Sequence, residues 1–119
     1  MLPEKTDQAL EAKLKHEEFR LKTQQQIAKD FSSHGFHFHS KFIEDAYCVS
    51  DLVQTVSEAM VEIIEKQPNS WHPLLYTMDV SENTYLKLAT SQNPTWIEEF
   101  TWIVIRREAL KVFFREQYI

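Results

Sequence analysis

Residues 96–118 have the sequence WIEEFTWIVIRREALKVFFREQY, and this stretch decides the fold. Arranged as an α-helix, it is apolar on two sides. One side carries Trp96, Phe100, Ile103, Leu110 and Phe114. The other side carries Trp102, Ile105, Ala109, Val112 and Phe113. Because a surface helix needs only one apolar side, this helix must either run through the middle of its domain or lie between its own domain and a second chain.

The run Thr101–Ile105 also has the residue types of a β-strand, because every residue in it is β-branched or aromatic. A helix is favoured, since Glu98-Glu99 and Arg106-Arg107 flank the run at helical spacing and no second run of similar strength could pair with it. Asn93-Pro94 is typical of a helix start, with Asn93 as the cap and Pro94 as the first helical residue.

The composition indicates one helical domain covering residues 1–119. With 119 residues, 43% of them hydrophobic, the chain is long enough to bury a core. It contains a single glycine, Gly35. Phosphate-binding loops and tight β-hairpins both depend on glycine, so nucleotide-binding and hairpin-rich folds are disfavoured. We predict an all-α compact bundle of four or five helices, with the two-sided C-terminal helix at its centre.

Charge and cysteine content restrict the function classes. The net charge of −5 disfavours binding to nucleic acid and to anionic membranes. The sequence contains no apolar run of transmembrane length and does not start like a signal peptide. Cys48 is the only cysteine, so an internal disulfide is excluded. We expect a cytoplasmic protein that binds neither nucleic acid nor membranes.

Residues 1–30 are dominated by charge, with ten charged side chains between residues 4 and 22. Apolar residues repeat every seven positions in this region but form only a thin, interrupted stripe. The pattern predicts a helix over about 6–29 that lies at the periphery of the core. The alternative is a helix that completes a coiled coil with a partner.

Residues 31–40 are predicted to be a connector, because Phe36-His37-Phe38-His39 alternates like an extended segment. Residues 41–119 are predicted to supply the core helices. Two descriptions fit residues 41–66: one continuous helix, or a helix over 51–66 with Ser50 as its N-cap.

Two shorter helices are expected before the last one. Pro73 suits the first turn of a helix that continues to Met78. Ser81 suits the N-cap of a helix over Glu82–Thr90.

The C-terminal 50 residues carry a set of short motifs: Leu74-Leu75-Tyr76, Asp79-Val80-Ser81-Glu82, Arg107-Glu108 and Lys111-Val112. In these motifs the chain resembles a family of short bacterial all-helical proteins of uncharacterised function. The resemblance implies a helical fold and no particular activity, because the shared residues cap and pack helices.

The histidines His34, His37 and His39 lie within six residues of one another. On an extended segment, imidazoles two positions apart point to the same side, which is one way to present ligands to zinc. The competing interpretation is a half-buried connector, with Phe36 and Phe38 packed inward and the imidazoles in water. A metal site at these histidines is the alternative function that the sequence suggests.

An acidic face is formed by Glu58, Glu62 and Glu65, which recur at helical spacing. It is either solvated or opposed by the basic residues of the last helix, in the same chain or in a second copy. These basic residues are Arg106, Arg107, Lys111 and Arg115.

Tryptophan and arginine are enriched among the residues that dominate binding energy at protein interfaces. The candidate partner-binding residues are Trp71, Trp96, Trp102, Arg106 and Arg107. With no catalytic motif and no cofactor-binding pattern, the sequence favours a non-enzymatic protein that acts by self-association, as a homodimer, or by binding another protein.

Overall fold

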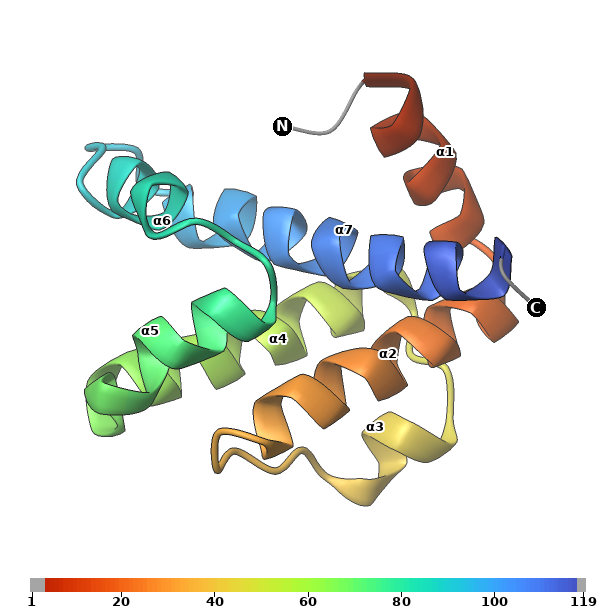
Figure 1. Ribbon diagram of the computed structural model, residues 1–119, viewed down its shortest axis with the longest axis horizontal. Helices are drawn as coiled ribbons and strands as arrows, with labels where there is room; N and C mark the ends of the chain where they lie inside the picture. Colours follow the sequence, from red (N-terminus) through yellow and green to blue (C-terminus); the bar gives the residue numbers. More distant parts are fainter. Residues whose placement is uncertain (1–3, 118–119) are drawn as a thin grey trace.

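The structure is a computed structural model that describes the backbone of residues 4–117 and the side chains of residues 8–117. Within this range the chain forms seven helices and no strand. The helices are α1 (Glu4–Leu14), α2 (Glu17–Ser32), α3 (Ser40–Glu44), α4 (Val49–Lys66), α5 (Pro68–Thr77), α6 (Glu82–Ala89) and α7 (Trp96–Gln117) (Figure 1). The all-α prediction is confirmed, but the expected number of four or five helices was too low.

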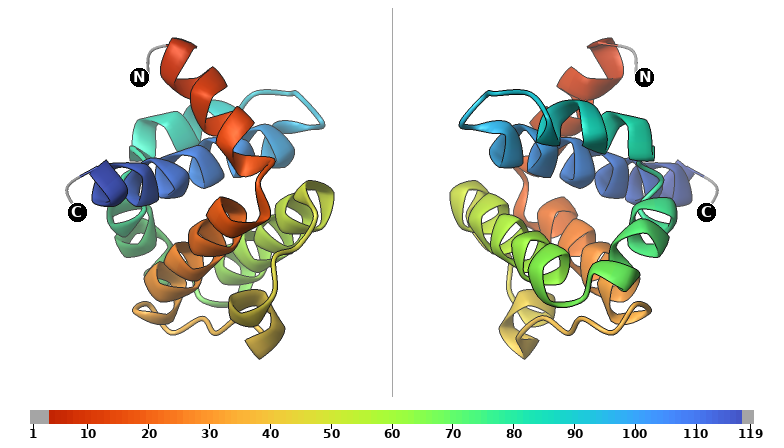
Figure 2. Two further views of the ribbon diagram at one scale, coloured as in Figure 1. Left: turned by 90° about the vertical axis from the view of Figure 1, so that its right-hand side faces the viewer. Right: turned by 90° about the vertical axis from the view of Figure 1, so that its left-hand side faces the viewer.

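Helix α7 occupies the middle of the fold. It contacts α1, α2, α4 and α6. In Figures 1 and 2, α1 and α6 lie on one side of α7, and α2 and α4 lie on the other. The two apolar sides of α7 are therefore covered largely by helices of the same chain, which explains them without a second copy. Residues 101–105 are helical throughout, so the strand alternative is wrong.

The N-terminal region consists of two helices, with a break at Lys15-His16. The prediction that this region is peripheral is wrong for α2, which buries Phe19, Ile27 and Phe31 against the core. It is also wrong for Leu10 of α1, whose side chain is only 1% exposed. The apolar stripe looks thin in the sequence because buried polar residues of α2 complete it.

Two of these buried polar residues, Arg20 and Gln24, bind backbone groups rather than water. Arg20 Nη1 donates to Leu14 O at 2.9 Å, and Arg20 Nε donates to Tyr47 O. Gln24 Nε2 donates to Phe42 O at 2.7 Å, and Gln24 Oε1 accepts from Tyr47 N at 2.8 Å. Buried backbone groups need such partners when the chain leaves a helix. α2 thus holds both the α1–α2 break and the segment between α3 and α4.

The connector and the start of the core helices differ in detail from the predictions. Residues 36–39 have no regular secondary structure, and Phe36 and Phe38 pack against the aromatic ring of Phe31. Residues 41–66 are not one helix, because α3 ends at Glu44 and α4 begins at Val49. The cap residue of α4 is Cys48, not Ser50.

The later helices largely follow the predictions. Ser81 Oγ accepts from Thr84 N at 3.1 Å and caps α6 as expected. Helix α5 begins at Pro68, so Pro73 lies inside a helix that it was expected to start. Asn93 Oδ1 accepts from Thr95 N at 3.0 Å, and α7 begins at Trp96 rather than at Pro94.

The buried hydrophobic side chains form one cluster, to which every helix except α6 contributes. Tyr85 and Leu88 of α6 are partly buried and pack against this cluster. Between residues 4 and 117, no helix combines the length and the hydropathy needed to span a bilayer.

Candidate functional site

A groove runs along the N-terminal half of α7, and we call it the α7 groove. Its floor is formed by Glu99, Trp102, Ile103 and Arg106, which lie on one face of α7 at spacings of i, i+3, i+4 and i+7. Its walls are Glu11, Leu14 and Lys15 of α1, with Val49 of α4 and Leu88 of α6. The groove has a volume of about 630 Å³.

The α7 groove has an apolar centre and a charged rim. The side chains of Leu14, Val49, Leu88, Trp102 and Ile103 supply the apolar surface. The rim carries two acidic residues, Glu11 and Glu99, and two basic residues, Lys15 and Arg106. An apolar strip bordered by charges of both signs is the surface expected of a protein-binding groove.

The rim charges are partly paired. Arg106 Nη1 lies 3.2 Å from Glu11 Oε1 and ties α7 to α1 across the groove wall. Glu99 Oε1 accepts from Asn93 Nδ2 at 3.0 Å. Such exposed contacts contribute little to stability, since water and salt screen them, and they can be rearranged when a partner binds.

The five predicted partner-binding residues do not form one surface. Trp102 and Arg106 lie together in the α7 groove. Trp96 is half-buried and packs edge-on against Tyr85. Arg107 lies elsewhere, with Nη1 3.9 Å from Asp79 Oδ2. The groove residues of α1, α4 and α6 were missed, because only tertiary structure brings them to α7.

Trp71 is a correction to the predicted surface. Its side chain is only 3% exposed and packs against Tyr85 and Phe100 in the core. Trp71 cannot contact a partner in this conformation, because α5, α6 and α7 enclose it.

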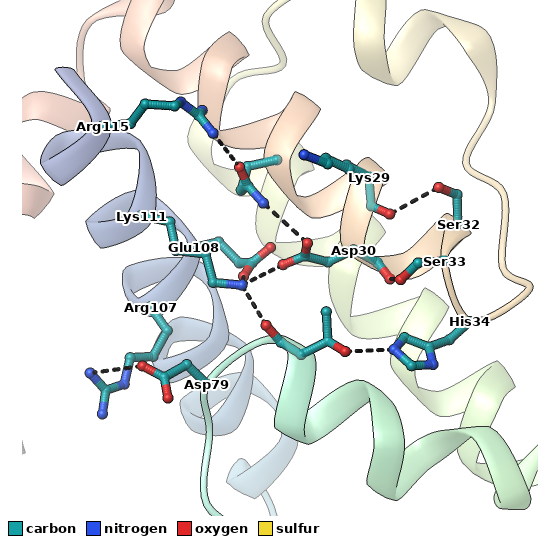
Figure 3. A network of polar contacts seen from close by, with 12 residues as sticks. Lys29, Asp30, Ser32, Ser33, His34, Asp79, Arg107, Glu108, Lys111 and Arg115 are labelled. Atoms are coloured by element: carbon teal, nitrogen blue, oxygen red, sulfur yellow. Dashed lines mark hydrogen bonds and ion pairs between the residues drawn. The ribbon is translucent and has the colours of Figure 1, made fainter. Parts of the chain in front are cut away.

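A second group of ionisable residues is a cluster in which Lys111, which is partly exposed, lies against the buried Asp30 and Glu108 (Figure 3). Lys111 Nζ donates to Asp30 Oδ2 at 2.6 Å and to Thr77 O, and lies 2.9 Å from Glu108 Oε1. Glu108 is 0% exposed. Neither of its carboxyl oxygens makes a directed hydrogen bond among residues 8–117, so its contact with Lys111 is one of proximity.

The environment of Glu108 favours its neutral form. Burial, reinforced by the neighbouring Asp30 carboxylate, raises the pKa of Glu108 to about 9, although Lys111 acts in the opposite direction. For Lys111, burial alone would lower the pKa, but Asp30 and Glu108 outweigh it and raise the pKa above its ordinary value. At neutral pH the cluster therefore holds Lys111 and Asp30 as an ion pair beside a protonated Glu108.

This cluster connects three parts of the fold. Asp30 is on α2, Thr77 ends α5, and Glu108 and Lys111 are on α7. The network continues through Gln26, which donates to Asp30 Oδ1 at 3.1 Å and accepts from Arg115 Nη1 at 2.8 Å. Because Glu108 is fully enclosed and Asp30 nearly so, the cluster is a structural connection rather than a substrate site. A glutamate at a core position of α7 was the sequence signal that could have revealed it.

The structure does not gather His34, His37 and His39 into a metal site. His34 Nε2 lies 2.6 Å from Thr77 Oγ1, and the Thr77 hydroxyl donates onward to Pro73 O, so the imidazole is the donor. His39 Nδ1 accepts from Lys41 N, and His37 is exposed. Among the described residues, no group of three or more His, Cys, Asp or Glu side chains is placed to hold a metal ion.

The acidic face of α4 does not meet the basic residues of α7 within the chain. Glu58, Glu62 and Glu65 are exposed around Val61. The α7 cations instead contact α1, α2 and the loop after α5. Within one copy the face is solvated.

No protein-family model matches this sequence, and comparisons with curated proteins and with solved structures found no significant match. The resemblance to short bacterial helical proteins therefore stays a prediction, and function has to be argued from the geometry of this chain.

Proposed function

We propose that this chain is a non-enzymatic, cytoplasmic protein-interaction module that binds an amphipathic helix of another polypeptide in the α7 groove. The observation that carries the proposal is the position of Trp102 and Ile103. Both side chains are only half-buried, and they form the apolar centre of the groove floor.

The shape and chemistry of the groove support a helical ligand. Helices recognised in grooves present anchors at i, i+3, i+4 and i+7 along one face. The floor of the α7 groove has this same spacing, so a ligand helix aligned with α7 could interdigitate with it. Trp102 lies at the centre of the groove and Arg106 at its rim. Tryptophan and arginine are residue types that dominate the binding energy of protein interfaces.

The rim supports a protein ligand over a nucleic acid. Its two acidic and two basic residues cancel in charge, whereas a nucleic-acid site needs a surplus of positive charge. The free thiol of Cys48 is exposed and suits a reducing compartment.

Selection from a displayed library of helical peptides tests the proposal with the full chain as bait. We expect amphipathic helical peptides to be selected, and Trp102→Ala to weaken their binding roughly 30-fold, because a central aromatic anchor is lost. The matched control is Tyr76→Ala, which removes an aromatic ring that is 89% exposed on α5 and should leave binding unchanged.

Circular dichroism melting of each variant separates lost binding from lost folding. Ile103→Lys provides a second groove variant that adds charge to the floor without removing the tryptophan. Peptides that bind wild type, Trp102→Ala and Ile103→Lys equally would contradict the proposal, and so would a monomeric chain for which the selection yields no helical binder.

A further inference from the structure

Charges of opposite sign lie at equal distances on the two sides of the half-buried Trp102 and Ile103 of α7. Residues 98–107 have the sequence EEFTWIVIRR, with two acids at one end and two bases at the other. The midpoint of this stretch lies between Trp102 and Ile103. Glu99 and Arg106 are equally far from the midpoint, so the stretch is complementary to itself when it is reversed.

The fold places this symmetry on the surface. Of these ten residues, Glu99, Trp102, Ile103 and Arg106 line the α7 groove. Their order along the groove is acidic, apolar, apolar, basic. Two such faces placed antiparallel, with a twofold axis at the midpoint, bring unlike charges opposite one another at both ends.

From this complementarity we propose that the helix bound in the α7 groove is α7 of a second copy, packed antiparallel about a twofold axis between Trp102 and Ile103. The proposal rests on the proposed function of the groove and names its ligand. Trp102 of each copy packs against Ile103 of the other, and Glu99 of each copy faces Arg106 of the other. The interface is isologous, as in most homodimers, because the same patch is used by both copies.

The contacts within each copy are compatible with this arrangement. Arg106 already lies 3.2 Å from Glu11, but a guanidinium has several N–H donors and can contact two carboxylates at once. The charge on the rim is balanced, so it adds no local repulsion to the net charge of −5 on each copy. Unlike pairs at the two ends also select the antiparallel orientation, since a parallel pair would place Glu99 against Glu99.

Charge reversal in the full chain, followed by sedimentation equilibrium, tests the proposal. In a homodimer, Glu99→Arg brings a second guanidinium opposite Arg106, and Arg106→Glu brings a second carboxylate opposite Glu99. We expect wild type to dimerise and each variant alone to self-associate roughly tenfold more weakly or worse, because like charges are brought together twice. An equimolar mixture of the two variants should regain dimerisation as a heterodimer.

The pairing in the mixture follows from the antiparallel geometry. One end of the heterodimer places the new arginine at position 99 of one copy against the new glutamate at position 106 of the other, and the other end keeps the native Glu99 against the native Arg106. Both ends are therefore unlike pairs, and we expect the affinity of wild type. In a parallel pair, position 99 would face position 99, and wild type itself would bring like charges together.

A matched control places the same charge change on another exposed face: Glu62→Arg on α4 should leave dimerisation unchanged. A dimer that persists in both groove variants, or a mixture that fails to regain dimerisation, would overturn the proposal.

The failure of this inference can be told from the failure of the proposed function. A wild-type chain that stays monomeric, but binds library peptides in a Trp102-dependent way, overturns the second copy as ligand and leaves the groove as a binding site. A monomeric chain that binds no helical peptide overturns both.

Discussion

Lys111 Nζ lies 2.6 Å from Asp30 Oδ2, although the two residues are 81 positions apart in the sequence. The same ammonium donates to the backbone oxygen of Thr77 and lies beside Glu108. It therefore joins α2, α5 and α7 at one point inside the protein. The Lys111 side chain is partly exposed, but it is the charge partner of the nearly buried Asp30 carboxylate, and a buried charge that loses its partner is costly.

Glu108 makes stability depend on pH. Its pKa is raised from 4.5 to about 9 on folding, so between these values the native state holds a proton that the unfolded state has lost. The stability that this proton contributes is fully present below the unfolded pKa and is lost as pH rises through the folded pKa. Glu108→Gln is neutral at every pH and removes the dependence. We expect the free energy of unfolding of wild type to fall relative to Glu108→Gln by about 2–3 kcal/mol between about pH 6 and pH 8.

Urea denaturation of both proteins across this pH range measures the difference. Glu65→Gln, at an exposed position of α4, is the control and should follow wild type. A pH profile of Glu108→Gln that runs parallel to the wild-type profile would mean that Glu108 is ionised in the folded protein.

Removing the ammonium should destabilise the fold strongly. Lys111→Ala leaves the nearly buried Asp30 carboxylate without its charge partner, and breaking a buried ion pair in this way costs on the order of 3 kcal/mol. Lys87→Ala removes an exposed lysine from α6 and should change stability by less than about half a kcal/mol. Equal losses for both variants in chemical denaturation would show that the cluster does not stabilise the fold.

Local patterns predicted the helices well where the deciding interactions are local. Ser81 caps α6 because its side chain reaches a backbone group three residues ahead, and such contacts can be inferred from spacing alone. The central position of α7 followed from its two apolar sides. The charged pairs Glu98-Glu99 and Arg106-Arg107 flank residues 101–105 at helical spacing. They correctly indicated a helix, although the residues between them have high β-propensity.

The sequence-based predictions failed where the deciding contacts join segments that are distant in the sequence. Gln24 looked like an interruption of an apolar stripe, yet it is buried because it binds backbone groups around Phe42 and Tyr47. The candidate site was found only in part for the same reason. Trp102 and Arg106 could be selected from α7, whereas Leu14, Val49 and Leu88 become neighbours of α7 only after folding.

We expect Leu10→Ala to destabilise the fold as much as the truncation of a central core residue. The sequence pattern predicts a loss below about 1 kcal/mol for Leu10→Ala, but the side chain is 1% exposed and packs between α1 and the core. Cavity formation at such a site costs about 2–5 kcal/mol, comparable with the loss expected for Phe100→Ala. Leu86→Ala is the control, because Leu86 is 44% exposed on α6. Chemical denaturation that gives Leu10→Ala and Leu86→Ala the same small loss would place α1 outside the cooperative core.

Of the three clustered histidines, we expect only His34 to affect stability. His34 donates to Thr77 Oγ1 and links the connector to the end of α5, so His34→Ala should cost about 1 kcal/mol, the usual value of one hydrogen bond. His37→Gln and His39→Gln change exposed side chains and should stay within about half a kcal/mol of wild type. We also expect the melting temperature of wild type to be the same with zinc and with a chelator, because metal affinity would otherwise add to folding free energy. A melting temperature that drops with chelator, and drops equally in the triple His→Gln variant, would instead establish a structural metal held by these residues.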